Sequence, residues 1–390
     1  MVRREITEVL KRYAGQFKAV AITGPRQSGK TTLSRMAFPQ KDYVSLEAPD
    51  VRMMAKSDPR HFIGRYPHGC ILDEAQRTPE LFSYLQGILD ANMAPGQFVI
   101  TGSQQFGMMQ EITQSLAGRV VLLSLMPFSA AELKLGGYFP ESLDAAVFTG
   151  CYPPVYDQHI DVVPWMNSYL ATYVERDVRQ VVNIRDVEHF QVFLRLCAGS
   201  VGQLFNASRI GADCGVNHGT VRNWLSVLKM SFVVFLLSPH HRNYRKRLVK
   251  TPKLYFWDTG VAARLLGIET ASQLATHPLR GALFENWIMV ELHKSRLNRG
   301  LNPDLFFWRN NTGLEIDAIA TSAAKLLPIE IKSGATIATD WFAPIERWLD
   351  LAGNESKEAL LIYGGNESFR RGRIRVVPWR LAAQVFGESE

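Results

Sequence analysis

Residues 17–32 read FKAVAITGPRQSGKTT, an apolar, β-branched run that leads through a glycine-rich turn into residues of helical character. The turn has the pattern GxxxxGK[ST], and its place between a strand and a helix is the context that the P-loop motif requires. Gly24 and Gly29 let the backbone direct its N–H groups at phosphate oxygens. Lys30 can reach the β- and γ-phosphates, and the Thr31 hydroxyl group can bind Mg²⁺. The stretch therefore predicts a site for ATP and Mg²⁺, formed by Gly24, Pro25, Arg26, Gln27, Ser28, Gly29, Lys30, Thr31 and Thr32.

Four more apolar runs follow at 42–48, 69–74, 98–103 and 119–125. Strands that alternate with helical segments predict a parallel sheet with helices on both faces. In GCILDEAQ the third strand ends in two adjacent acids, Asp73 and Glu74. We expect Asp73 to complete the Mg²⁺ shell and Glu74 to polarise the attacking water. The alternative is that the acid pair only caps the next helix.

The strand FVITGS places Thr101 and Ser103 at its tip, beside the expected phosphate site. A hydroxyl group there could orient the water and sense the γ-phosphate, although plain strand–turn chemistry explains the residues equally well. Residues 107–120 then predict a helix that ends just before a strand, with Arg119 at the junction. Arg119 could reach the nucleotide of a neighbouring subunit as an arginine finger, or it could form a local ion pair at the helix end.

Four motifs, GPRQSGKT, CILDEAQR, ITGS and SLAGR, occur in this order and resemble the AAA+ ATPases. Together with CYPPVY (151–156), YVERDV (173–178), the run at 246–267 and GALFENWIMVEL (281–292), they resemble the bacterial and archaeal group in which an ATPase of the AAA_14 type is fused to a DUF4143 region. The resemblance implies a helical lid behind the core and a homo-oligomer, either a hexameric ring or a dimer. Within YVERD we expect an ion-pair network between lid and core, formed by Tyr173, Glu175, Arg176 and Asp177.

Positive charge is concentrated in one segment of the chain. The formal net charge is +7, and the segment between Cys214 and Trp257 contains no acidic residue. Such a segment predicts a polyanionic partner, and we expect that partner to be DNA. The candidate contacts are Arg222, Asn223, Arg242, Arg245, Lys246, Arg247, Lys250 and Lys253.

The pattern of residues 204–258 predicts a winged helix. A first helix is broken at Gly215, and a second starts at Thr220, which can cap it. Helix, glycine turn and helix form a helix-turn-helix, whose second helix can enter the major groove of DNA. Runs at 232–240 and 248–258 then read as two strands joined by the basic hairpin HRNYRKR. The alternative is a protein–protein module with a solvated basic tip.

The last third carries charged residues in positions that resemble the PD-(D/E)xK nuclease fold. Glu285 lies on a predicted helix, Asp317 in the second of two strands joined at NNTG, and Glu330 and Lys332 on the following strand PIEIK. In that fold Asp317 and Glu330 would share a divalent metal, with Glu285 as a further ligand. Lys332 would orient or activate the water. The alternative is a degenerate copy in which Glu330 and Lys332 form a salt bridge.

The sequence thus predicts an α/β chain: a P-loop AAA+ core at 1–128, a helical lid at 129–194, a winged helix at 195–268, and a restriction-endonuclease-like α/β domain at 269–390. We expect a cytoplasmic ATPase that remodels DNA or moves along it, with a metal-dependent nuclease domain. A nucleotide-gated switch and a DNA-binding scaffold with a vestigial nuclease are the alternatives. The four scattered cysteines predict reduced thiols, and the most apolar segment (232–237) is too short to span a bilayer.

Overall fold

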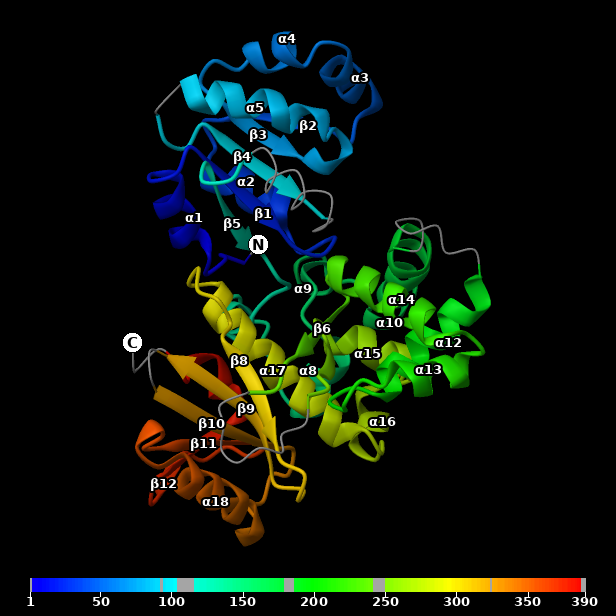
Figure 1. Ribbon diagram of the computed structural model, residues 1–390, viewed down its shortest axis with the longest axis vertical. Coiled ribbons are helices and arrows are strands. Elements are labelled where there is room, and N and C mark those ends of the chain that lie inside the picture. Colours follow the sequence, from blue (N-terminus) through cyan, green and yellow to red (C-terminus); the bar gives the residue numbers. More distant parts are fainter. Residues whose placement is uncertain are drawn as a thin grey trace.

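A computed structural model describes residues 2–91, 94–103, 116–178, 186–240, 250–322 and 325–386. Three parts follow one another along the chain (Figure 1): a first sheet with its helices, a helical middle, and a second large sheet near the C-terminus. The predicted helix at 107–120 falls largely outside the described residues. In the described part, no helix is both long and apolar enough to cross a membrane. All four cysteines are buried and carry free thiols.

The first sheet is parallel, as the alternating pattern predicted. Its five strands are ordered β2-β3-β4-β1-β5. Their bounds are β1 Ala19–Thr23, β2 Asp42–Ser45, β3 Cys70–Asp73, β4 Phe98–Gly102 and β5 Val120–Ser124. The helices in this part are α1 Thr7–Ala14, α2 Lys30–Ala37, α3 Pro49–Ser57, α4 Pro59–Gly64 and α5 Glu80–Ala91, with a short 3-10 helix η1 Ala75–Arg77.

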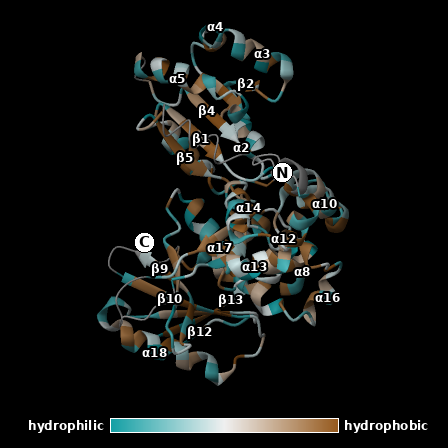
Figure 2. Cartoon of the chain, turned by 45° about the vertical axis from the view of Figure 1, so that its right-hand side comes forward, coloured by the Kyte–Doolittle hydropathy of each residue, from teal (hydrophilic) through white to brown (hydrophobic). Residues whose placement is uncertain are grey.

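Helices cover both faces of this sheet because successive side chains of a strand point to opposite sides. Ala19 and Ala21 of β1 belong to one core cluster with Leu81 of α5. Val20 of β1 belongs to a second cluster with Leu33 of α2. In Figure 2 the inner strands β1, β4 and β5 are brown, whereas the outer helices α3 and α4 carry teal segments.

The helical middle begins where the chain leaves β5. Its elements are α7 Ala130–Leu135, α8 Leu143–Thr149, α9 Pro153–Asp157, α10 Val162–Tyr169, the π-helix η2 Leu170–Val178, α12 Val187–Gly199, α13 Ala207–Cys214, α14 His218–Met230, the antiparallel strands β6 Val234–Leu237 and β7 Lys253–Phe256, α15 Thr259–Leu265 and α16 Ala271–Ala275. The residues 241–249 between β6 and β7 lie outside the description, and so do the predicted contacts Arg242, Arg245, Lys246 and Arg247.

Helices α13 and α14 meet at a tight turn. Gly215 ends α13 in the left-handed region with φ 73°, where a glycine is favoured because it has no Cβ. The predicted start of the second helix is wrong by two residues. Helix α14 begins at His218, and its cap is Asn217, whose side chain accepts the Thr220 N–H at 2.9 Å. Asparagine is as good a cap as threonine or better, so the first available polar side chain takes the position.

The second large sheet is mixed and six-stranded, in the order β12-β13-β11-β10-β9-β8. Its strands are β8 Leu305–Arg309, β9 Glu315–Ser322, β10 Lys325–Lys332, β11 Ala359–Tyr363, β12 Phe369–Arg371 and β13 Ile374–Pro378. Helix α18 Phe342–Ala352 packs on one face, where it joins a cluster with Leu361. Short 3-10 helices lie at η3 Thr339–Trp341, η4 Gly353–Glu355 and η5 Trp379–Gln384.

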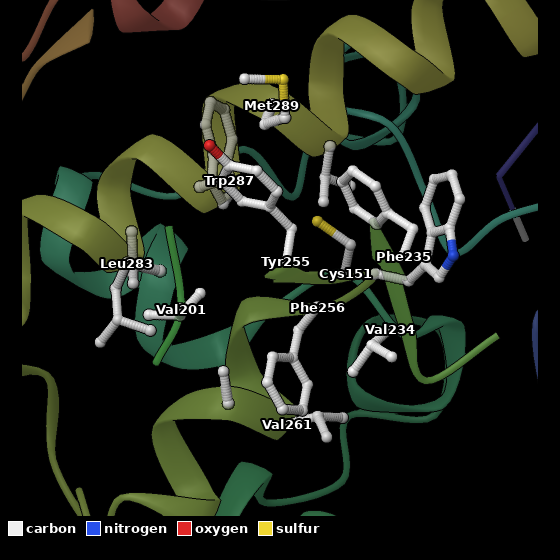
Figure 3. Packing of buried hydrophobic residues seen from close by; sticks show 14 of the residues in the cluster. Cys151, Val201, Val234, Phe235, Tyr255, Phe256, Val261, Leu283, Trp287 and Met289 are labelled. Carbon is white, nitrogen blue, oxygen red and sulfur yellow. The ribbon is translucent and has the colours of Figure 1, made fainter. Parts of the chain in front are cut away.

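Helix α17, Arg280–Leu297, lies between the helical middle and the other face of this sheet (Figure 1). Every residue from 286 to 296 is buried, so the helix has no solvent face along that stretch. One hydrophobic cluster includes residues of α17, of the β6–β7 hairpin, and Leu360 of β11. Figure 3 shows the part of this cluster where Trp287 and Met289 of α17 lie near Tyr255 of β7.

Asn286 fixes the hairpin to α17. Its Oδ1 accepts the Phe256 N–H at 2.7 Å, and its Nδ2 donates to the Phe256 carbonyl oxygen at 2.8 Å. Both residues are fully buried. Asn286→Ala would leave both backbone groups buried without a partner, which costs about 1–3 kcal/mol for each group. We expect the variant to lose about 3 kcal/mol of unfolding free energy, measured by urea denaturation.

The matched control is Asn302→Ala, at an exposed position. It should change the unfolding free energy by less than about 0.5 kcal/mol, as is usual for surface substitutions. Equal effects of the two substitutions would contradict the role given to Asn286.

Candidate functional site

The P-loop turns sharply where β1 ends. Gly24 has φ 150°, and a Cβ there would come within 2.1 Å of the Leu125 carbonyl oxygen, so no other residue fits without a backbone shift. Gly29 has φ 92° and precedes the first residue of α2. Both predicted glycine positions therefore have a conformation that favours glycine.

Lys30 lies against the loop that it follows. Its Nζ donates to the Gly24 carbonyl oxygen at 2.9 Å and to the Pro25 carbonyl oxygen at 2.7 Å. Burial lowers the pKa of Lys30 to about 8, with partial compensation from the carboxylates of Glu74 and Asp73. The ammonium group is thus held inside the loop by neutral carbonyl groups, which are weaker partners for a cation than phosphate oxygens are.

Three hydroxyl groups converge on the carboxylate of Asp73. Thr31 Oγ1 lies 2.9 Å from Oδ2 and 3.1 Å from Oδ1, Tyr43 donates to Oδ2 at 2.6 Å, and Thr101 Oγ1 donates to Oδ1. Burial, together with the hydrogen bond to Asp73, raises the pKa of Tyr43 to about 12, which keeps the phenol protonated as a donor. Mg²⁺ prefers hard oxygen ligands, and the Thr31 hydroxyl and Asp73 carboxylate fit that ion. Tyr43 belongs to no motif in the sequence that predicted a role for it.

Glu74 adopts a left-handed conformation with φ 55°, which is uncommon outside glycine and is typical of functional sites. Its Oε2 accepts hydrogen bonds from Ser103 Oγ at 3.0 Å and from Gln76 Nε2 at 2.5 Å. The contacts hold one carboxylate oxygen at the carboxyl edge of the sheet. Gln76 was also missed, although it follows the acid pair directly in GCILDEAQ.

A cavity of about 910 Å³ adjoins these residues and extends to the helical middle. Lys30, Thr31 and Glu74 line one side, and Trp165 and Tyr169 line the other. The volume falls within the range of small-molecule and cofactor sites. Of the predicted ion-pair network, Tyr173 donates to the Ser231 carbonyl oxygen at 2.9 Å. The side chains of Glu175, Arg176 and Asp177 lie outside the description.

Arg4 bonds to the P-loop and lines the same cavity, and no sequence motif identified it. Its guanidinium group donates to the Ser28 carbonyl oxygen at 2.7 Å, to the Met126 carbonyl oxygen at 2.6 Å and to Glu132 Oε1 at 2.9 Å. Arg4 is 7% exposed and Glu132 is fully buried. The ion pair therefore joins the N-terminal segment, the P-loop and α7.

Arg119 lies at the surface and pairs within its own chain. Its Nε and Nη2 donate to the two carboxylate oxygens of Asp90 at 2.6 and 2.8 Å. This hydrogen-bonded pair with the Arg119 guanidinium lowers the pKa of the exposed Asp90 carboxyl. The geometry matches the local ion pair that was the alternative to an arginine finger.

Helix α14 exposes polar side chains on one face. Arg222, Asn223 and Lys229 are exposed, whereas Trp224 and Leu228 are buried in the core. Lys250, the first described residue after the hairpin tip, is also exposed. These positions leave Arg222, Asn223, Lys229 and Lys250 accessible to a polyanion.

The prediction that Lys253 contacts DNA is wrong. Lys253 is 3% exposed and does not face solvent with the other basic residues. Its Nζ lies 3.1 Å from Glu285 Oε1, 2.6 Å from Glu315 Oε1 and 3.9 Å from Asp317 Oδ1. Burial alone would lower the pKa of Lys253, but the carboxylates of Glu285, Asp317 and Glu315 together raise it above its usual value. Lys253 stays charged and belongs to the acidic cluster, not to a DNA-binding surface.

Glu330 and Lys332 form the salt bridge of the degenerate alternative, with Lys332 Nζ 2.5 Å from Glu330 Oε1. The other oxygen, Glu330 Oε2, is buried and has no hydrogen-bond partner. Burial raises the pKa of Glu330 to about 8 and that of Glu285 to about 7, and the Asp317 carboxylate adds to both shifts. Asp317 Oδ2 accepts the Ile331 N–H at 2.8 Å.

The expected metal site of Asp317 and Glu330 is not found in the described part of the chain. Among these residues, no group of three or more His, Cys, Asp or Glu side chains has an arrangement that could hold a metal ion. The lysines already pair with several of these carboxylates: Lys253 contacts Glu285 Oε1 and Glu315 Oε1, and Lys332 contacts Glu330 Oε1.

Three family models match successive parts of the chain. A model described as an AAA domain matches residues 16–134. Two models described as domains of unknown function, DUF8612 and DUF4143, match residues 140–272 and 280–382. The first match covers the P-loop, Glu74 and the strands that carry Asp73 and Thr101.

Two mycobacterial proteins are similar along most of their length. The uncharacterized proteins Mb2031c of Mycobacterium bovis and Rv2008c of Mycobacterium tuberculosis are each 31% identical over 338 residues, which is 86% of this chain and 74% of theirs. Among solved structures, the Walker-type ATPase paby2304 of Pyrococcus abyssi matches with a TM-score of 0.47 and 15% identity, covering 67% of this chain and 94% of that one.

Arg4→Ala should destabilise the protein strongly, because it leaves the Glu132 carboxylate buried without its cation. Breaking a buried pair in this way costs about 3–5 kcal/mol. The neighbouring Arg3 pairs with Glu8, and their side chains are 70% and 68% exposed. Arg3→Ala is therefore the control, with an expected loss of less than about 1 kcal/mol. Urea unfolding of both variants measures the difference, and similar losses would contradict a structural role for Arg4.

Proposed function

The chain belongs to the family of AAA-type P-loop ATPases that carry a DUF4143 domain, and from this premise we propose that it uses ATP hydrolysis to act on DNA. One observation supports the ATPase part most directly: Lys30, Thr31 and Glu74 line a single cavity, beside the Asp73 carboxylate that Thr31 contacts. The residues present suit ATP bound with Mg²⁺.

The roles follow from the positions of the side chains. Lys30 would exchange the two loop carbonyl groups for phosphate oxygens, and Thr31 with Asp73 would hold Mg²⁺, which neutralises charge on the phosphates. Glu74 would accept a proton from the attacking water. Hydrogen bonds from Ser103 and Gln76 orient its carboxylate. Trp165 and Tyr169 on the far side of the cavity are aromatic surfaces on which a base can stack.

The DNA part of the proposal rests on the helix-turn-helix. Helix α14 exposes Arg222, Asn223 and Lys229, and the basic segment has no acidic side chain to repel phosphates. Nonspecific affinity for DNA comes mainly from such phosphate contacts. The hairpin residues Arg245, Lys246 and Arg247 lie outside the described residues and stay part of the sequence-based prediction.

Two alternative functions remain for the whole protein: a nucleotide-gated switch, and a DNA-binding scaffold with a vestigial nuclease. The ATPase rate with and without duplex, forked and four-way DNA separates them. A DNA-acting motor turns over many times and is stimulated by DNA. A slow rate that DNA leaves unchanged would favour the switch, and DNA binding without turnover would favour the scaffold.

The C-terminal domain is not given a nuclease role in this proposal, since its carboxylates are engaged by Lys253 and Lys332. We favour the vestigial alternative for this domain. Assembly into a ring or dimer and a cytoplasmic location stay predictions. The proposal does not depend on an arginine finger, because Arg119 is bonded to Asp90.

Lys30→Ala should abolish ATP binding, because it removes the cation that faces the β- and γ-phosphates. Glu74→Gln should bind ATP normally but hydrolyse it about 10²–10⁴-fold more slowly, the range expected for loss of a general base. Nucleotide titration and phosphate release measure the two steps. Glu80→Gln is the matched control, at an exposed position on α5, and should behave as wild type. Normal turnover in Glu74→Gln would remove Glu74 from the water-activating role.

The double variant Arg222→Ala/Lys229→Ala should bind duplex DNA more weakly, and by a similar factor for all sequences. Each phosphate contact contributes about 0.9 to the slope of log K against log salt concentration, so the slope should fall by up to about 1.8. Fluorescence anisotropy at several salt concentrations measures it. The charge-matched control is Arg347→Ala/Lys357→Ala, at two exposed positions of the C-terminal part. An unchanged slope in the α14 variant would show that this helix does not contact phosphate.

A further inference from the structure

The acidic cluster of the C-terminal domain is completed by a residue from another part of the chain. Glu285 comes from α17, Glu315 and Asp317 come from β9, and Lys253 comes from β7 of the hairpin. The Lys253 Nζ contacts two of these carboxylates at 3.1 and 2.6 Å and lies 3.9 Å from the third. A single buried cation thus lies among Glu285, Glu315 and Asp317. The fold resemblance assigns Asp317 and Glu285, together with Glu330, to a metal.

Lys253 is fixed in this position by the strand that carries it. β7 pairs with β6 in the register Leu237 to Lys253, and an isolated bridge joins Lys253 to Leu204. Two positions along the same strand, Tyr255 donates to the same Glu285 oxygen at 2.5 Å. Asn286 then bonds both backbone groups of Phe256. The lysine side chain is 4% exposed, and these contacts hold the strand that carries it.

A divalent cation does not fit beside this ammonium group. Mg²⁺ takes its oxygen ligands at about 2.0–2.1 Å. An ion bound to Glu285 Oε1 and Glu315 Oε1 would share both oxygens with the Lys253 ammonium group, which already contacts them. Repulsion between the ion and the ammonium group would weaken binding further, since like charges at short range repel strongly in a buried site.

The remaining oxygens do not form a second site. Arg309 Nη1 lies 3.2 Å from Glu315 Oε2, and Lys332 occupies Glu330 Oε1. Glu330 Oε2 is buried without a hydrogen-bond partner, and the described residues contain no group of three acidic, histidine or cysteine side chains with metal-binding geometry. The donor set therefore does not fit the metal that the fold resemblance implies.

We propose that Lys253 is a resident cation that replaces the divalent metal, so that the C-terminal domain does not bind Mg²⁺ and does not cleave DNA. The charge of Lys253 stabilises the carboxylates of Glu285, Glu315 and Asp317, and it fastens the hairpin to the C-terminal sheet. This inference is independent of the ATPase cycle, because Lys253 is remote in sequence from the P-loop and bonds to none of its residues.

The test is a titration of the full-length protein with Mn²⁺ in the absence of nucleotide, with free Mn²⁺ followed by electron paramagnetic resonance. Wild type and Asp317→Asn should give the same curve, because wild type has no metal at this site. Lys253→Met should gain a site that binds Mn²⁺ at least about tenfold more tightly than wild type does, since it removes a positive charge next to three carboxylates. The double variant Lys253→Met/Asp317→Asn should lose this site again.

Lys325→Met is the control for loss of a lysine from the same domain, at an exposed position, and should match wild type. Thermal unfolding establishes which variants are folded. If wild type has a Mn²⁺ site that Asp317→Asn removes, the proposal is wrong, and this comparison does not require Lys253→Met to fold. A folded Lys253→Met protein that gains no site would also overturn it.

Discussion

Buried charges hold the junction where the chain leaves the first sheet and enters the helical middle. Glu291 Oε2 of α17 accepts the Ala130 N–H at 2.7 Å, and Lys294 Nζ donates to the Phe128 carbonyl oxygen at 2.7 Å. Glu291 and Lys294 pair with each other at 3.0 Å, and both are almost fully buried. Because a buried charge is costly unless it is paired and hydrogen-bonded, these contacts tolerate little displacement. With the Arg4–Glu132 pair a few residues away, they connect the ATPase sheet to α17.

The requirement that a buried charge be paired has different consequences at the two acidic sites, around Asp73 and around Glu285. Around Asp73 the partners are hydroxyl groups and Lys30 bonds only to carbonyl oxygens, so stronger ionic partners can replace them at low cost. Around Glu285 the partners are the Tyr255 hydroxyl and the ammonium group of Lys253, which brings a full charge and is part of a strand. A carboxylate whose partners are neutral groups can accept a charged ligand. A carboxylate whose partner is a fixed ammonium group of the same chain already has its charge balanced.

Much of the architecture could be predicted from local pattern. The strands of the first sheet and the glycine positions of the P-loop depend on periodicity and backbone conformation, which are visible in a short window. Lys253 could not be placed, because its neighbours in sequence are basic whereas its neighbours in space come from α17 and β9. Tyr43 and Arg4 carry no motif, and their roles arise only when β2 and the N-terminal segment meet the P-loop region. Asn217 was missed because Asn217 and Thr220, three residues apart, could both have capped the helix.

The burial of α17 on all sides has a consequence for folding during synthesis. The helix supplies core both to the helical middle and to the second sheet, yet it lies at residues 280–297 and is therefore made after most of that middle. We expect the middle to expose apolar surface on the ribosome until α17 and the strands behind it have emerged. Such surface is prone to aggregation. The helical middle can therefore complete its core only after α17 has been synthesised.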